Sequence, residues 1–577
     1  MRRYFTIFIS NLFITLICVP SVNAQTSTNQ ENLSIVELIN HFREDRGALQ
    51  RYYHIEASPV HRERMMSFYQ SYRQQMNELR YQALSVSEQV DYHLLLREIE
   101  DQQVKLEEED ALYGSLKPWI DDGASLYHYE TLRRRGHRLP AEQVGSDLFD
   151  IRESYQDHIK TLKKEHPVFS KKEIRFVSRA LKGQKEILKS LDGFYKGYDP
   201  EYDWWTKEPI KNLTNVLDKY QKTFNARLDS NRMNVDDGSG IAGIPAGRHE
   251  LIRQLKRDMI PYTPEELIDI AQKEFAWCDA ELLKASKAMG YGSDWKAAQE
   301  KVKQSYVSPG EQPAMMLQLY DESVNFLKDH DMITIPPLAE ETWRMNMLSA
   351  RRQLVSPFFL GGETLLISYP TDQMDHDDKM MSMRGNNPHF ARAVVHHEII
   401  PGHHLQQFMN RRYQIHRGYL FGTPFWTEGW SLYWELLLYE KGFAKTPEDK
   451  IGMLFWRMHR CARIIFSLKY HLGEWTPQRC IDFLVDRVGH ERANAAAEVR
   501  RSFSGGYPPL YQLAYLTGGF RFYELKKELV DSGKMSLREY HDAVLHENAM
   551  PIEMLRFILL DKPVPKEFET EWRFYER

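Results

Sequence analysis

Four histidines and a glutamate lie between His396 and His404, in the run His-His-Glu-Ile-Ile-Pro-Gly-His-His. Zinc in hydrolases is commonly held by imidazoles and a carboxylate, with one coordination position left open for water. A glutamate beside a ligating histidine can also act as the general base for that water. The run therefore predicts a site for one Zn²⁺ ion, with histidines that merely fill a helix kink as the alternative.

The spacing of this run differs from the common zinc motif H-E-x-x-H. In that motif the two histidines are four residues apart, about 40° apart around a helix of ~3.6 residues per turn, so both face one ion. Here Pro401 stands where the second histidine would be. Proline inside a helix removes a backbone donor and clashes with the preceding turn. We interpret Pro401 and Gly402 as a two-residue insertion that distorts or restarts the helix.

The insertion leaves two candidates for the histidine that binds the ion together with His397. If a bulge absorbs the two extra residues, His403 returns to the face that carries His397. A regular helix would favour His404 instead, at nearly the same angle as His397 but roughly 10 Å further along the axis. Because that is a long reach for two ligands of one ion, His403 is the predicted ligand and His404 the alternative.

A second predicted helix offers the third ligand. It is expected to begin near Pro424, which suits an early helical position, and to stop at Gly442. Glu428 and Glu435 share one face of this apolar, tryptophan-rich segment. A buried carboxylate is costly without a partner, and a divalent cation is a natural one. Glu428 is therefore the predicted third ligand, and an exposed or arginine-paired glutamate is the alternative.

These two segments resemble motifs of the family known as domain of unknown function 885, whose members resemble zinc metallopeptidases of the gluzincin type. The segment from His397 to Gln406 corresponds to the family's H-E-x-x-P-G-H-x-x-Q. The segment from Glu428 to Tyr433 corresponds to its E-G-W-A-L-Y, with Ser431 in place of the usual alanine. The likeness continues to the C-terminus and covers most of the chain that would remain after export.

The resemblance implies a role for each matching residue. His397, His403 and Glu428 look like zinc ligands, and Glu398 looks like the base. The chain departs from the family's pattern further on, where Ser467 and Lys469 stand in place of an aspartate and a glycine. The family's substrate preference is therefore not carried over.

Peptide hydrolysis at such a site also needs a donor to the developing oxyanion and a surface that holds the peptide. Tyr515 and His471 are the candidate donors, although a tyrosine within an apolar run more often belongs to the core. Residues 364–369 form the best strand candidate, a small β element beside the predicted cleft. The edge of that strand could pair with an extended peptide, or the strand could be buried and structural.

The N-terminus predicts export. Two arginines precede a largely apolar run from Phe5 to Val19, and Val22-Asn23-Ala24 follows as a cleavage site, so residues 1–24 are a predicted signal peptide. The apolar run is too short to favour a membrane anchor. A bulky isoleucine precedes Cys18, which does not suit a lipoprotein signal. We expect a protein without a stable membrane anchor, in the periplasm or outside the cell.

Net charge and cysteine content bear on nucleic-acid binding, thiolate metal sites and disulfides. The chain has 76 basic and 81 acidic residues, a net charge of −5, which argues against a nucleic-acid binder. Cys278, Cys461 and Cys480 would remain after export, and their wide spacing offers no thiolate metal motif. One disulfide is compatible with them but not demanded. The sequence does not indicate an oligomeric state.

The elements that must position the site are predicted to be mainly helices. Apolar residues recur at helical spacing over long runs such as 87–106 and 264–288. A chain of 577 residues exceeds what one compact core usually holds, so two lobes are expected. The polar, glycine-containing stretch 236–240 is the predicted link between an N-terminal helical lobe, residues 25–240, and a catalytic lobe, residues 241–577. The expected architecture is a two-lobed, metallopeptidase-like helical fold.

Together these features predict an exported zinc metallopeptidase that acts on oligopeptides. The chain lacks a G-x-S-x-G elbow and a P-loop, which weakens serine-hydrolase and nucleotide-binding interpretations. One alternative is a non-catalytic protein that binds peptides or metal at the same residues. Another is a zinc hydrolase of a non-peptide amide or ester. The end from which a peptide would be cleaved, and a metal other than zinc, stay open.

Overall fold

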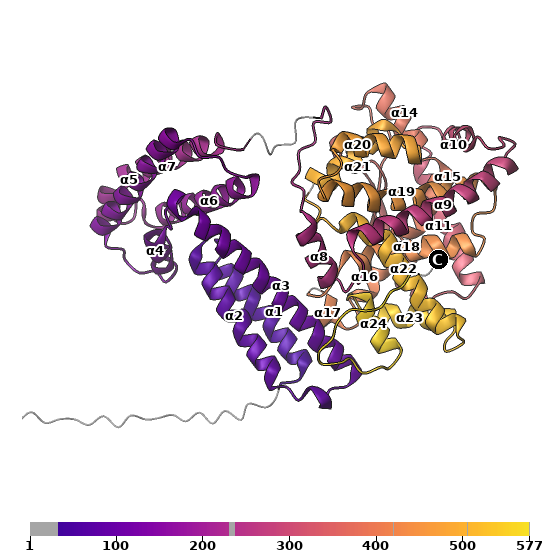
Figure 1. The fold of residues 1–577 in the computed structure, drawn as a ribbon, viewed down its shortest axis with the longest axis horizontal. Helices are drawn as coiled ribbons and strands as arrows, with labels where there is room; N and C mark the ends of the chain where they lie inside the picture. Colours follow the sequence, from indigo (N-terminus) through magenta and orange to yellow (C-terminus); the bar gives the residue numbers. More distant parts are fainter. Residues whose placement is uncertain (1–32, 230–236, 419, 505, 576–577) are drawn as a thin grey trace, which may run out of the picture.

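The computed structural model describes residues 33–229, 237–418, 420–504 and 506–575. The predicted signal peptide, residues 1–24, lies outside the described residues. The described chain is mainly α-helical with one pair of short strands, as predicted. Figure 1 shows a large body of helices and a smaller group of helices, with a slanted bundle of three long helices between them.

The N-terminal half of the chain forms the bundle and the smaller group. The bundle consists of α1 (Ile35–Tyr52), α2 (Pro59–Glu78) and α3 (Val86–Leu116). The smaller group consists of α4 (Ala124–Arg134), α5 (Ala141–Glu165), α6 (Lys171–Tyr195) and α7 (Pro200–Asn225). Serine caps start the bundle helices, because Ser34, Ser58 and Ser85 each accept a hydrogen bond from a backbone N–H of the first turn.

The large body contains the remaining helices and the two strands. Its helices of eight residues or more are α8 (Arg248–Arg257), α9 (Pro264–Ala288), α10 (Trp295–Lys303), α11 (Gln312–Asp329), α14 (His376–Gly385), α15 (Pro388–Glu398), α16 (His403–Asn410), α18 (Pro424–Glu440), α19 (Pro447–His471), α21 (Arg492–Ser504), α22 (Tyr511–Lys526), α23 (Leu537–Glu547) and α24 (Ile552–Leu559). Its shorter helices are α12 (Pro337–Thr342), α13 (Ala350–Gln353), α17 (Ile415–Gly418) and α20 (Pro477–Phe483). The prediction of a helix over 264–288 matches α9 at both ends.

The strands form one parallel pair. β1 (Arg344–Met347) pairs with β2 (Thr364–Ile367), with Arg344 opposite Thr364. On its other side β2 meets Leu360, because Leu360 and Leu366 exchange backbone hydrogen bonds of 3.0 and 2.8 Å. The predicted strand is therefore present, and at Leu366 it has a neighbour on both sides. The choice between a peptide-pairing and a structural role stays a prediction.

The buried apolar side chains gather in two clusters. The larger cluster joins side chains of residues 35–99 to those of residues 241–574, and the smaller one lies within residues 55–224. The first half of α3 belongs to the larger cluster and its end, with Tyr113 and Leu116, to the smaller one. The three-helix bundle thus connects both cores, and the division into lobes at residue 240 stays a prediction.

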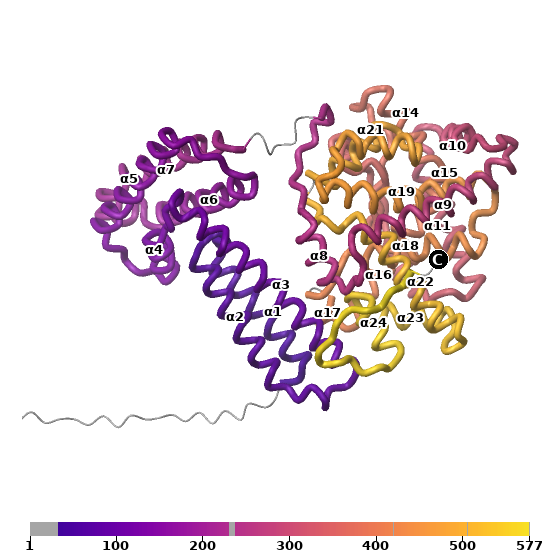
Figure 2. The backbone as a smooth tube through the Cα atoms, in the orientation of Figure 1, coloured from indigo at the N-terminus to yellow at the C-terminus, as the bar shows by residue number. Residues whose placement is uncertain are grey.

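The C-terminal part of the chain packs against the three-helix bundle. Figure 2 shows the yellow C-terminal segment around α24 beside the indigo α3, and these two helices pack against each other. The backbone N–H of Val564 donates to Gln89 of α3 at 2.9 Å, and the Tyr81 hydroxyl donates to the Val564 carbonyl at 2.7 Å. The bundle is therefore held to the large body from its first helices onward.

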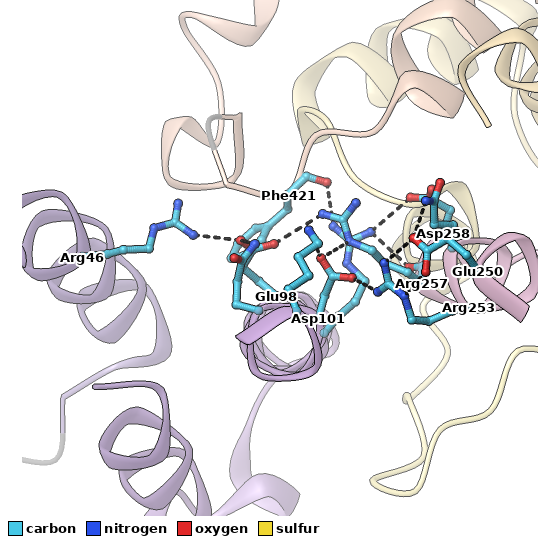
Figure 3. A network of polar contacts seen from close by, with 12 residues as sticks. Arg46, Glu98, Asp101, Glu250, Arg253, Arg257, Asp258 and Phe421 are labelled. Atoms are coloured by element: carbon cyan, nitrogen blue, oxygen red, sulfur yellow. Dashed lines mark hydrogen bonds and ion pairs between the residues drawn. The ribbon is translucent and has the colours of Figure 1, made fainter. Parts of the chain in front are cut away.

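A network of buried charges also joins α3 to α8 (Figure 3). Asp101 of α3 lies 2.5 Å from the Nη1 of Arg253 and 3.0 Å from the Nε of Arg257, both on α8. Glu98, one turn earlier, lies 2.8 Å from Arg46 of α1 and 3.5 Å from Arg257. Arginines thus surround both carboxylates and fix how the bundle meets the large body.

The described residues bear on two further predictions. Cys278, Cys461 and Cys480 are all buried free thiols, so these three form no disulfide with one another. Among the described helices, none is both long enough and apolar enough to cross a bilayer.

Candidate metal centre

The histidine run spans a break between two helices, as the proline predicted. α15 ends at Glu398 and α16 begins at His403. Gly402 makes the break possible, because a Cβ at this position would lie 1.8 Å from the carbonyl oxygen of His397. The Nε1 of Trp430 on α18 donates to the Pro401 carbonyl at 2.8 Å and holds the break in place.

The break turns His397 and His403 toward each other. Their rings are perpendicular, with centroids 4.8 Å apart. Both Nε2 atoms approach the same carboxylate oxygen, Oε2 of Glu428, at 3.5 Å from His397 and 3.2 Å from His403. The alternative ligand His404 points elsewhere, since its Nε2 lies 2.7 Å from the Ala339 carbonyl oxygen. The structure thus brings together the predicted set of two histidines and one glutamate.

Glu428 reaches this point from α18. Thr423 caps the helix, Pro424 is its first residue, and Gly442 with φ of +82° follows its end, as the sequence predicted. The Tyr511 hydroxyl of α22 donates to Oε1 of Glu428. Oε2 is buried and has no hydrogen-bond partner among the described residues. One oxygen is therefore oriented by a tyrosine while the other is left for the ligand cluster.

α22 reaches Glu428 because two glycines let the helices touch. A Cβ on Gly429 of α18 would lie 2.6 Å from the Cα of Gly518 on α22. This close crossing presents Tyr511 and Tyr515 to the site from the first turns of α22. The sequence analysis missed Tyr511, although its spacing of four from Tyr515 places both on one helix face.

The three ligand atoms fit a divalent cation. One atom from each of His397, His403 and Glu428 lies within 4.8 Å of the other two, and all three side chains are buried. Two imidazoles and a carboxylate form a donor set typical of catalytic zinc. The unpartnered Oε2 of Glu428 is costly to bury unless a cation or a proton meets it. The residues present therefore suit the predicted ion.

Electrostatics at the cluster favour an ionised ligand and a basic neighbour. Burial opposes ionisation of Glu428, but the attraction of His403 and His397 outweighs it and holds the pKa of that carboxyl well below its usual range. For Glu398 the balance is reversed, because burial raises its pKa although both histidines pull it down. A carboxylate with a raised pKa accepts and returns a proton more readily near neutral pH.

A second layer of polar groups orients the two histidines. The Nδ1 of His397 lies 2.7 Å from Oε1 of Glu435, which Arg460 also contacts at 2.9 Å. Burial opposes ionisation of Glu435, but Arg460 and His397 lower its pKa to about 2. The Ser431 hydroxyl lies 3.2 Å from the Nδ1 of His403. Each imidazole is thus held at Nδ1 with Nε2 facing the cluster, an arrangement that supports metal ligation.

Glu398 lies at the wall of a cavity rather than among the three ligands. Its Oε2 is 4.0 Å from the Nε2 of His403. A Cβ on Gly361 would lie 2.4 Å from that Oε2, and the Gly362 N–H donates to the Glu398 carbonyl at 3.1 Å. Only glycine at residue 361 allows the backbone to pass so close to Glu398.

The cavity has a volume of about 260 Å³ and opens onto the whole cluster. It is lined by Phe358, Phe359, Leu360, Gly361, Val394, His397, Glu398, His403, Gln407, Thr427, Glu428, Trp456, Arg460, Arg463, Arg501, Tyr507, Tyr511 and Tyr515. The β2 strand is absent from this wall, and the segment just before it, residues 358–361, faces the site instead.

The two candidate oxyanion donors lie in different places. The Tyr515 ring lies almost parallel to the His397 ring, 15° apart with centroids at 5.9 Å, and Tyr515 lines the cavity. Burial raises the pKa of its hydroxyl, which therefore stays protonated and able to donate. His471 does not line the cavity. It ends α19, where its Nδ1 accepts a hydrogen bond of 3.2 Å from the Ala246 N–H.

Comparison with known proteins identifies a family and a shared fold. The family model described as "Bacterial protein of unknown function (DUF885)" matches residues 50–558. A solved structure from Shewanella oneidensis, described as a candidate lipoprotein of unknown function, is similar with a TM-score of 0.64 at 16% identity, over 92% of this chain and 100% of that one. A candidate lipoprotein from Colwellia psychrerythraea is similar with a TM-score of 0.54 at 14% identity, over 91% and 98%. No curated protein matches the sequence.

Proposed function

Because the chain belongs to the bacterial family DUF885, whose function is unknown, its activity must be argued from its site, and we propose that it is a zinc-dependent peptidase of oligopeptides. The observation that carries this proposal is the convergence of His397, His403 and Glu428 beside Glu398 in one cavity. Three protein ligands with a neighbouring carboxylate are what metal-assisted hydrolysis requires.

His397, His403 and Glu428 would hold the ion in this proposal. Zinc at such a site polarises a carbonyl and lowers the pKa of water toward ~7. Glu398 takes one proton from the attacking water and later delivers it to the nitrogen of the leaving amine. Water is thereby added across the peptide C–N bond, with its hydroxyl on the new carboxyl group and its proton on the new amine. Tyr515 donates a hydrogen bond to the oxygen that gains negative charge.

The charge of each residue suits its step. Glu398 is buried and has a raised pKa, so it can hold a proton between the two transfers. Glu435 and Arg460 keep His397 oriented while the substrate changes. Gly361 leaves room for a substrate chain beside Glu398, where any larger residue would meet the base.

We extend the proposal to the location of the protein. The predicted signal peptide supports export to the periplasm or beyond. Two solved structures of similar fold are described as candidate lipoproteins, which are exported proteins, and this description supports the same location. The oligopeptides would then be those present in that compartment.

The test is cleavage of a mixed oligopeptide library by the zinc-loaded protein, followed by mass spectrometry. Glu398→Gln is expected to lower the cleavage rate about 10²–10⁴-fold while zinc stays bound, because general acid–base groups contribute that much. Glu440→Gln is the matched control, since Glu440 is an exposed glutamate at the end of the same α18 that carries Glu428.

Two outcomes would contradict the proposal. Cleavage that persists in Glu398→Gln would remove the assigned base. Zinc binding without cleavage of any library peptide would favour a peptide- or metal-binding protein, or a hydrolase of a non-peptide amide or ester.

A further inference from the structure

One wall of the cavity carries three arginines that the proposed chemistry does not use directly. Arg460 and Arg463 come from α19 and Arg501 from α21. Arg460 already has a partner, because it donates a hydrogen bond to Glu435, the carboxylate that contacts the Nδ1 of His397. Arg463 and Arg501 remain, and both face the same buried carboxylate, Glu498.

Glu498 cannot satisfy both of these arginines. Its Oε1 accepts from the Nε of Arg463 at 2.7 Å and from Gln512 at 3.1 Å. Its Oε2 lies 3.5 Å from the Nε of Arg501, an ion pair without a hydrogen bond. Burial opposes ionisation of Glu498, but Arg463 and Arg501 lower its pKa to about 2. Two guanidinium charges therefore share one carboxylate charge.

A donor is also left over at this wall. The Nη1 of Arg463 is buried and has no hydrogen-bond partner within the described chain, whereas the Nε of Arg501 faces Oε2 of Glu498 at 3.5 Å. The side chain of Arg463 is 2% exposed and that of Arg501 8%. A buried, unpartnered guanidinium nitrogen is costly unless a ligand meets it. The surplus positive charge and the unused N–H group of Arg463 both favour binding of an anion. A planar carboxylate matches guanidinium geometry.

The arginine pair lies a short distance from the metal ligands. The guanidinium carbon of Arg463 lies 4.3 Å from the centre of the Tyr515 ring, and the His397 ring lies 5.9 Å from the same centre. The guanidinium carbon and the imidazole centre are therefore no more than about 10 Å apart. Because an extended residue spans about 3.5 Å, a carboxylate on Arg463 lies one or two residues from a peptide bond at the ligand cluster.

The cavity is small for a long peptide. Its volume of about 260 Å³ falls just under the roughly 300–1,000 Å³ of ordinary small-ligand pockets. Such a space accepts the end of a chain more readily than its middle. We propose that Arg463 and Arg501 form a subsite for the C-terminal carboxylate of the substrate, so that the enzyme removes one or two residues from the carboxyl end of peptides. This inference rests on the proposed peptidase function.

A carboxylate can reach the subsite from two sources, the C-terminus or an acidic side chain. The experiment therefore compares three peptides of one sequence without other acidic residues. The first has a free carboxyl end, the second is amidated at that end, and the third is amidated but carries a glutamate near it. We expect amidation to lower kcat/KM at least ~100-fold, about 2.7 kcal/mol, and the glutamate to restore less than a tenth of that loss.

Binding provides a second readout that does not depend on turnover. In the zinc-loaded Glu398→Gln protein the free-acid peptide is expected to bind at least ~10-fold tighter than its amide, because the guanidinium pair contacts only the acid. Arg501→Gln is expected to remove this difference by weakening the acid alone, and Arg501→Lys to restore part of it. Arg492→Gln, at an exposed position of the same α21, is the control and keeps the full difference.

The outcomes separate this inference from the proposed function. Equal cleavage of the free acid and the amide overturns the carboxylate subsite while the peptidase stands. Cleavage of neither peptide overturns the peptidase, and the binding measurement then decides the subsite. Equal affinity for acid and amide, or no affinity for either, overturns it. Full restoration by the glutamate assigns the subsite to an acidic side chain and contradicts cleavage from the carboxyl end.

Discussion

The network between α3 and α8 and the cluster between α15 and α18 are both built from buried charges on helices. In the network, Asp101 lies at 2.6 Å from Lys105, 2.5 Å from Arg253 and 3.0 Å from Arg257, so cations of the chain surround the carboxylate. In the cluster, no arginine or lysine of the described chain lies within ion-pair distance of Glu428, and the imidazoles of His397 and His403 face it instead.

The difference separates a structural role from a ligand-binding one. A carboxylate that the chain supplies with permanent cations holds two helices together and needs nothing further. A buried carboxylate opposed only by imidazoles is compensated either by protons on those imidazoles or by a metal ion that replaces the protons. Removing one partner is therefore expected to reduce stability in the network and to reduce metal binding in the cluster.

The largest effect is expected from Glu428→Gln. This change removes the one charged ligand, so zinc affinity should fall by more than the ~10–100-fold that loss of an outer partner costs, and hydrolysis should be lost. Zinc per chain after dialysis and the cleavage rate measure both effects. The counterpart in the network, Glu98→Gln, should keep its zinc. Zinc loss in both variants would contradict the assignment of a metal-binding role to the cluster and a structural role to the network.

Asp101→Asn is expected to have a smaller effect, and to change stability rather than zinc binding. It removes one carboxylate partner from Arg253 and Arg257, which keep Glu250 and Glu98, so the free energy of unfolding should fall by about 1–3 kcal/mol. A lower urea midpoint with unchanged zinc per folded chain is the predicted result. Glu100 is on the same helix as Asp101 and forms an exposed ion pair with Arg73 of α2. Glu100→Gln should therefore lower the free energy of unfolding by less than ~1 kcal/mol. Equal midpoints for the two variants would contradict the structural role.

Glu435→Gln should weaken the cluster without removing a ligand. The carboxylate holds the Nδ1 of His397, and loss of such an outer partner typically lowers metal affinity ~10–100-fold, about 1.4–2.7 kcal/mol. Competition with a chelator of known zinc affinity measures the change. Glu440→Gln on the same helix should leave zinc affinity unchanged. An unchanged affinity in Glu435→Gln would mean that His397 is oriented by its packing alone.

The smallest effect is expected from Ser431→Ala. The hydroxyl lies 3.2 Å from the Nδ1 of His403 and is neutral, so its bond is weaker than the charged bond of Glu435. Zinc affinity should fall less than ~10-fold in the same chelator competition. A loss as large as that of Glu435→Gln would show that the two outer partners are equivalent.

The grouping of His397, His403 and Glu428 could be predicted from the sequence because local signals place each residue on its helix. Pro401 and Gly402 predict the break between α15 and α16. This break lets His403 rather than His404 face His397. The helix that carries Glu428 has its own start and stop signals in Thr423 and Gly442. Such features depend on neighbours within a few residues, which a sequence displays directly.

The remaining parts of the site depend on contacts between distant segments. Tyr511 reaches Glu428 through the crossing of α18 and α22, and Arg501 reaches the cavity from α21. No local pattern reports such crossings. His471 was predicted as a site residue but lies at the C-terminal end of α19, where it is hydrogen-bonded to the backbone. Its residue type alone did not reveal this position. β1 was missed because it has only four residues and three of them are exposed, so no buried face marks it in the sequence.

Metal content of the purified protein tests the central claim most directly. Wild type, His403→Ala and His404→Ala are dialysed against buffer with trace zinc and analysed for zinc per folded chain. We expect about one zinc in wild type and in His404→Ala, because the His404 Nε2 is bound to the Ala339 carbonyl, and none in His403→Ala. Zinc retained by His403→Ala, or lost only from His404→Ala, would contradict the assignment of the metal centre.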